Sequence, residues 1–70
     1  MSFYDYRVSA DIVRSDPPFD AIIMAAMRKA DTVNAHRLRS AFPELHAELV
    51  ARYNAPGAIL PGDPEARPRD

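Results

Sequence analysis

Side-chain hydroxyls are the candidate nucleophiles of this 70-residue chain, which contains no cysteine. A hydroxyl attacks a substrate efficiently only when a neighbouring base takes its proton. The hydroxyl-bearing candidates are Ser2, Ser9, Ser15, Thr32 and Ser40. Most of them stand at expected helix caps or at exposed helical positions, which explains their presence without chemistry. We therefore predict no catalytic residue among them.

Carboxylates and glycines offer equally little to an active site. Glu44 and Glu48 lie four residues apart and would face outward from a helix, as a solvated edge does. Both glycines, Gly57 and Gly62, follow the last expected helix, so no glycine-rich loop precedes a helix to bind phosphate. A chain of this length also has little room for a ligand pocket. The sequence thus predicts a protein that is not an enzyme and holds no cofactor.

Histidine is the strongest metal ligand left in a chain without cysteine, and it occurs at His36 and His46. The two residues are ten positions apart and belong to different helix faces, so we predict no metal site. His46 falls on the apolar face of its helix, where a histidine usually serves as a hydrogen-bonded core or interface group. The sequence leaves the role of His46 open.

The elements that must position any functional group are helices, and the sequence predicts an all-α fold, a small bundle of three to four short helices. The expected helices cover residues 3–14, 17–30, 32–42 and 43–53. Ser2 and Asp5 match a capping box ahead of the first helix. The apolar spacing equally allows that helix to begin near Val8.

Prolines and acidic caps mark the later helix starts. Asp16 is expected to cap the second helix ahead of Pro17, and Asp31 is expected to cap the third. Pro43 suits the first turn of the fourth helix. Because the connection at Asp31 is very short, the second and third helices should meet in a sharp turn.

The C-terminal segment is rich in proline and glycine and is predicted to form a clasp followed by a tail. Ile59 and Leu60 are large aliphatic residues between two turns, so we expect them to fold back onto the helices. Residues 63–70 contain two prolines, five charges and no large apolar side chain, so burial cannot offset the entropy of ordering them. The expected organisation is one helical domain over residues 1–62 and a disordered charged tail over residues 63–70.

The most apolar stretch, residues 19–30, has the periodicity of a central helix with one wide core face. That face consists of Phe19, Ile22, Ile23, Ala26, Met27 and Ala30. Ala21 and Ala25 lie on another side and leave room for the close approach of a second helix. The first helix also has two apolar rows, of which a single core needs only one. The candidate partner-binding residues are Tyr4, Val8, Ile12, Ala21 and Ala25.

Self-association would add stability to a chain of this size, whose core supplies only ~3–5 kcal/mol. A disulfide is excluded because cysteine is absent. Phe3, Tyr4 and Tyr6 place three aromatic residues where an interface could have its energetic centre. We therefore predict a non-catalytic protein-interaction module whose partner is a second copy, as a homo-oligomer, or another protein.

Residues 19–42 also imitate a helix-turn-helix, which makes nucleic-acid binding the alternative function. The residues available for it are Asn34, His36, Arg37 and Arg39. Asparagine and arginine side chains can read base edges. The formal net charge of −1 and the four acidic residues within residues 1–20 weigh against attraction to phosphate.

A resemblance to a known group covers about residues 16–63. The chain carries an AIIMAAMRKADT helix, an AFPE segment, an ARYNAPG turn and an LPGD ending. In these features it resembles small proteins encoded by actinobacteriophages and by related actinobacterial prophages. The resemblance implies a phage accessory protein that binds a host or phage protein, with no known activity or cofactor.

The sequence contains no run of 18 apolar residues that could span a membrane. We therefore expect a cytoplasmic location in the bacterial host cell and no membrane partner.

Overall fold

Four α-helices make up most of the computed structural model, which describes residues 2–66. Helix α1 spans Phe3–Arg14, α2 spans Phe19–Lys29, α3 spans Thr32–Ala41 and α4 spans Pro43–Asn54; the 3-10 turns η1 and η2 follow at Pro56–Ala58 and Pro64–Ala66. No strand occurs within the described residues. The predicted all-α fold class is therefore confirmed.

Helix α1 begins at Phe3 because its capping box is fully formed. The Asp5 amide donates to the Ser2 hydroxyl at 3.2 Å, and the Ser2 amide donates to the Asp5 carboxylate at 3.0 Å. These bonds satisfy two backbone donors that would otherwise lack a partner at the helix start. The open question of where this helix begins is thus answered in favour of Phe3 over Val8.

The linker between α1 and α2 is longer than predicted, because α2 begins later than expected. Helix α2 covers Phe19–Lys29 and is shorter at both ends than the expected residues 17–30. Each proline of the Pro17-Pro18 pair keeps the residue before it out of the α region, which excludes Asp16 and Pro17 from a helix. Asp16 adopts a positive φ of 54° instead. The expected cap at Asp16 is wrong, since Pro18 occupies the N-cap position without a side-chain hydrogen bond.

Helices α3 and α4 begin where their sequence signals predict. The Asn34 amide donates to the Asp31 carboxylate at 2.8 Å and so caps α3. Phe42 leaves the helical conformation because Pro43 follows it, and Pro43 opens α4. The α3 helix ends one residue earlier, and the α4 helix one residue later, than expected.

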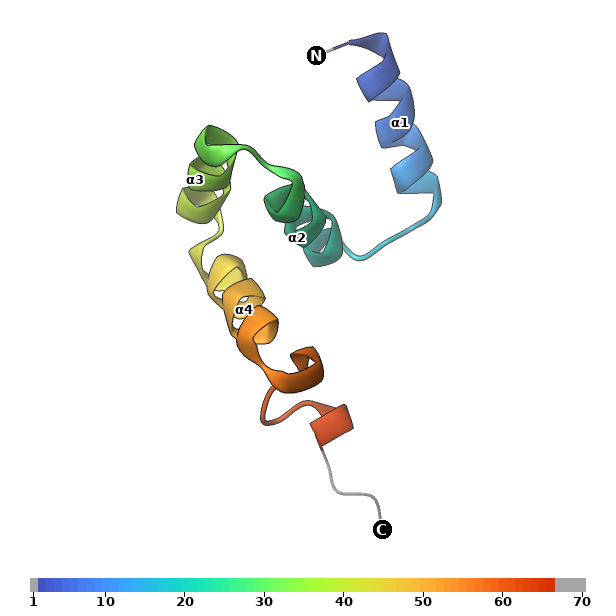
Figure 1. Cartoon of the computed structure of the whole chain (residues 1–70). Coiled ribbons are helices and arrows are strands. Elements are labelled where there is room, and N and C mark those ends of the chain that lie inside the picture. The colour runs from blue at the N-terminus through green and yellow to red at the C-terminus, as the bar shows by residue number, and fades with distance from the viewer. Residues whose placement is uncertain (1, 67–70) are drawn as a thin grey trace.

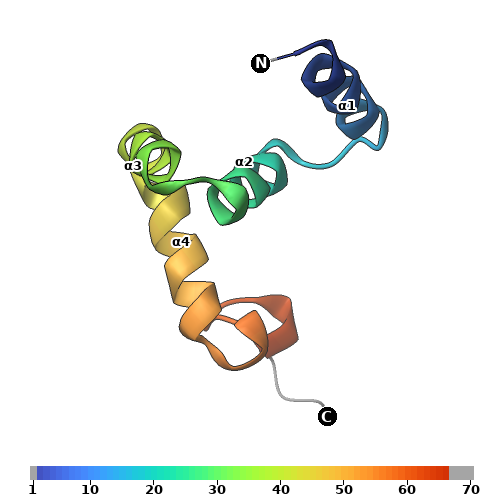
Figure 2. The ribbon, with the colours of Figure 1, turned by 45° about the horizontal axis from the view of Figure 1, so that its top comes forward.

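Helices α2, α3 and α4 each pack against the other two, whereas α1 packs on none of them. Figures 1 and 2 show α1 standing apart, joined to the rest by its linker. The ring of Phe19 in α2 lies against Phe42 at the α3–α4 junction, with centroids 6.1 Å apart. The radius of gyration is 15.0 Å, whereas a compact chain of this length would have about 11 Å. The four helices are therefore arranged less compactly than in a typical domain of this length.

Met27 of α2 is the one buried residue within residues 2–66, at 9 % exposure. Ile22 and Ile23 of the predicted core face are half-buried. Phe19 and Ala26 are exposed, so the prediction that they belong to the core is wrong. The reason is that α3 and α4 cover only one side of α2, which leaves the edges of a wide apolar face in solvent.

Arg52 of α4 closes the C-terminal clasp by binding Asp63. Its guanidinium donates to the two Asp63 carboxylate oxygens at 2.7 and 3.0 Å and to the Ala58 carbonyl at 2.8 Å. The Leu60 amide donates to the same carboxylate at 2.9 Å. These bonds hold η1 against α4 and leave Leu60 half-buried. The clasp therefore depends on an ion pair as well as on an aliphatic side chain.

The predicted tail of residues 63–70 overlaps this clasp. Asp63 is bound to Arg52, and the next three residues form η2. Ile59 remains 39 % exposed, so Leu60 is the better covered member of the aliphatic pair. Residues 67–70 of the predicted tail lie outside the described residues.

The Arg52–Asp63 contact predicts a pH dependence of the clasp. The hydrogen bonds from Arg52 lower the pKa of Asp63 most, and the hydrogen bond from the Leu60 amide lowers it further, from 3.8 to about 2. Because the pKa in the folded chain lies below the unfolded value, the stabilisation is complete above pH 3.8 and is lost as the pH falls toward 2. We expect the Asp63 carboxyl and the Leu60 amide to titrate together by NMR. Asp63→Asn should remove that titration at Leu60, whereas Glu65→Gln should leave it unchanged.

Candidate partner-binding surface

Aromatic side chains dominate the exposed surface of α1. Phe3, Tyr4 and Tyr6 are 78 %, 66 % and 72 % exposed. A large aromatic side chain that stays in water does not provide the stabilisation that its burial would give. Such side chains are enriched at the energetic centres of interfaces. Because α1 packs on no other helix of the chain, its own fold does not use these side chains.

One of the two apolar rows of α1 ends near α2, because its last member, Ile12, lines a hollow together with residues of α2. The row consists of Tyr4, Val8 and Ile12, spaced four residues apart on the helix. Val8 is half-buried, while the two end members of the row are exposed. The row therefore presents a continuous apolar strip along about two turns of the helix.

A hollow of about 350 Å³ lies at the C-terminal end of this row, at Ile12, between α1 and α2. We refer to it as the α1–α2 hollow. Its lining consists of Ile12, Pro17, Ala21, Ile22, Ala25, Ala26 and Lys29. The structure thus brings together three of the five candidate partner-binding residues, namely Ile12, Ala21 and Ala25. Tyr4 and Val8 do not line the hollow but extend its apolar wall along α1.

The candidate nucleic-acid-binding residues are divided by the structure. Asn34 and Arg37 line a hollow of about 490 Å³ between α2 and α3, together with Lys29 of α2. His36 and Arg39 lie elsewhere on α3 and are exposed. The sequence did not place Lys29 in this group, because its proximity depends on the angle between the two helices.

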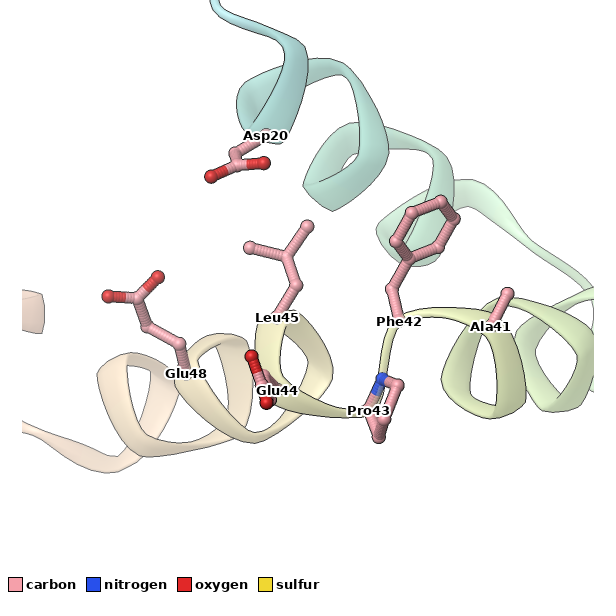
Figure 3. A pocket seen from close by; sticks show the side chains of 7 residues that line it. All are labelled: Asp20, Ala41, Phe42, Pro43, Glu44, Leu45 and Glu48. Carbon is pink, nitrogen blue, oxygen red and sulfur yellow. The ribbon is translucent and has the colours of Figure 1, made fainter.

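Three carboxylates surround a further hollow of about 690 Å³ where α2 approaches the start of α4. Figure 3 shows Leu45 and Phe42 directed toward α2, with the carboxylates of Asp20 and Glu48 to one side. Glu44 also lines the hollow. No group of three or more histidine, cysteine or acidic residues within residues 2–66 is arranged to hold a metal ion.

A further hollow, of about 700 Å³ and mostly apolar, lies between α2, α4 and η1. It is lined by Met24, Arg28, Leu49, Val50, Arg52, Tyr53, Ala55 and Ala58. Arg52 already binds Asp63 in the clasp, so of the two arginines in this lining it is the one that stabilises the C-terminal segment.

Three hydroxyls form local hydrogen bonds in α1 or at its ends. The Ser9 and Ser15 hydroxyls each donate to a backbone carbonyl three residues earlier, at 2.6 Å. The Ser2 hydroxyl belongs to the capping box. The Ser2 hydroxyl donates to the Asp5 carboxylate at 3.1 Å, so each of these three hydroxyls has a hydrogen-bond partner within one helical turn.

No protein-family model, curated protein or solved structure matches this chain. The resemblance to small actinobacteriophage proteins therefore stays a prediction. Within residues 2–66, no helix has both the length and the apolar character needed to span a membrane.

Proposed function

We propose that this chain is a small non-catalytic protein-interaction module that binds its partner through α1. The observation that carries the proposal is the isolation of α1, which exposes three aromatic side chains and packs on no other helix. An isolated helix of 12 residues is marginal in water, because nucleation is costly and few hydrogen bonds offset it. Helix α1 therefore gains most when a partner covers its apolar surface.

The phage resemblance supports the same function. Short accessory proteins of phages often act by binding a host or phage protein. We accordingly place the proposed module in the cytoplasm of a bacterial host cell, with a protein of the host, of the phage or of its own kind on α1.

Site-specific photo-crosslinking tests this function. A photoreactive phenylalanine analogue at Tyr4 should form a protein adduct on irradiation in an actinobacterial lysate. The same analogue at Val33, an apolar residue of α3 that is 59 % exposed and lines none of the hollows, is the matched control. Equal adduct yields at the two positions, or none at Tyr4, would contradict the proposal.

Nucleic-acid binding is the second candidate function, favoured by the convergence of Lys29, Asn34 and Arg37 on one hollow. If phosphate occupies that hollow, affinity for duplex DNA must fall steeply with added salt. Fluorescence anisotropy with random duplex at low salt measures this. Arg37→Ala should then weaken binding far more than Arg39→Ala, which lies outside the hollow. Absence of binding at micromolar protein removes this candidate.

A further inference from the structure

We infer that the partner on α1 is a second copy of this chain, in a symmetric dimer with the two α1 helices antiparallel. The inference rests on the proposed function of α1 as the binding helix and identifies the molecule that occupies it. In this dimer, α1 of the second copy lies along the Tyr4–Val8–Ile12 row and covers the α1–α2 hollow.

The area that the chain leaves in solvent is sufficient for such a dimer. Its accessible surface is 6272 Å², whereas a compact monomer of 7.8 kDa exposes about 4,400 Å². Five residues lie outside the described range; subtracting the largest area that five average residues can expose, about 160 Å² each, still leaves an excess of about 1,000 Å². A stable interface buries about 800 Å² of each partner. One dimer interface therefore accounts for most of the excess.

The spacing of the α1 row is self-complementary. With a two-fold axis at Val8, Tyr4 of each copy faces Ile12 of the other, because both residues are four positions from Val8. The bulky aromatic ring then meets an aliphatic side chain instead of a second ring. On α2, the small side chains of Ala21 and Ala25 leave space beside Ile12 for the incoming helix.

The charges of α1 are compatible with pairing to itself. The helix carries two acids and two arginines, Asp5, Asp11, Arg7 and Arg14, so two copies meet without net repulsion. Antiparallel packing also places the positive end of each helix dipole beside the negative end of the other. The Tyr4–Val8–Ile12 row itself carries no charge that would have to be desolvated.

The linker keeps the docking surface accessible. Asp16 is held at a positive φ, and two prolines follow it. Prolines fix their own φ and restrict the preceding residue, so the linker cannot continue either helix. This conformation directs α1 away from α3 and α4 and leaves the α1–α2 hollow open to a second copy.

Light scattering across a concentration series tests the dimer. The mass should rise from 7.8 kDa toward twice that value as concentration increases. Ile12→Glu should weaken dimerisation on the order of 100-fold, since two carboxylates would enter an apolar contact. Val13→Glu makes the same kind of change at the next residue, which points to another side of α1, and it should dimerise like the unmodified chain.

Cysteine crosslinking tests the position of the two-fold axis. Because the chain contains no cysteine, a single introduced cysteine is the only thiol that can form a disulfide. Facing positions of closely packed helices approach the distance that a disulfide bridges. Val8→Cys should therefore form a covalent dimer with oxidised glutathione about tenfold faster than Ala10→Cys, which lies on the opposite side of α1. This variant replaces a half-buried aliphatic side chain with a small apolar one, so it remains informative where Ile12→Glu fails to fold.

A mass of 7.8 kDa at every concentration, or equal crosslinking of Val8→Cys and Ala10→Cys, overturns the second copy as the partner. Photo-crosslinking from Tyr4 then separates this failure from failure of the proposed function. An adduct of Tyr4 with a different protein preserves the interaction module, and the absence of any adduct overturns both.

Discussion

Met27→Ala is expected to unfold this protein at room temperature. Truncating a buried methionine to alanine costs about 2–5 kcal/mol, because apolar contacts are lost and a cavity remains. The core of so small a domain supplies only ~3–5 kcal/mol in total. Met27 is the one buried residue within residues 2–66, so no other side chain in this region is as well shielded from solvent.

Urea unfolding followed by circular dichroism measures this effect. Val33→Ala is the control, because it also truncates an apolar helical residue but at a position 59 % exposed; its effect should stay within about 0.5 kcal/mol. Ile23→Ala and Leu49→Ala should fall between the two, since both residues are half-buried. If Met27→Ala and Val33→Ala unfold at the same urea concentration, Met27 does not hold the helices together.

The starts of α1, α3 and α4 could be predicted from the sequence because their causes are local. The Ser2 and Asp5 side chains reach each other within one turn, and the Asp31 carboxylate reaches the Asn34 amide in the same way. Proline restricts its neighbour whatever the rest of the chain does, which fixed the start of α4. The same rule, applied to both members of Pro17-Pro18, would have excluded Pro17 from α2 and brought the predicted start to within one residue of Phe19.

Burial could not be predicted in the same way, because periodicity shows which face of a helix is apolar and not whether another element covers it. Phe19 illustrates the difference. It belongs to the apolar face of α2 and touches Phe42, yet it is 59 % exposed because α1 does not fold over it. Exposure of that kind is decided by the linker geometry and by the angle between helices.

The candidate surface was predictable where it followed one helix and not where it joined distant residues. The Tyr4–Val8–Ile12 row follows from helical spacing alone. Its junction with Ala21 and Ala25 depends on the direction in which the linker sends the chain. The Arg52–Asp63 pair was missed for the same reason, since the two residues meet only because the Pro61-Gly62 turn reverses the chain.

Phe42→Ala is expected to have the second largest effect and to loosen the corner where α2, α3 and α4 meet. Phe42 both ends α3 and precedes α4, and its ring contacts Phe19 of α2 at 6.1 Å between centroids. A fully buried phenylalanine costs about 3–5 kcal/mol when truncated, so a half-buried one should cost about 2–3 kcal/mol. Loss of this magnitude would remove most of the stability of so small a core.

Two controls isolate the contribution of the ring in the same urea experiment. Phe42→Leu keeps an apolar side chain of similar volume and should cost less than about 1.5 kcal/mol. Tyr53→Ala removes an aromatic ring of α4 that is 85 % exposed, and it should change stability by less than about 0.5 kcal/mol. If Phe42→Ala unfolds at the same urea concentration as Tyr53→Ala, Pro43 alone defines the corner and the Phe19–Phe42 contact adds no stability. The expected order instead makes the aromatic contact the link that holds α2 on the α3–α4 pair, and thereby positions the Ala21 and Ala25 side of α2 for its partner.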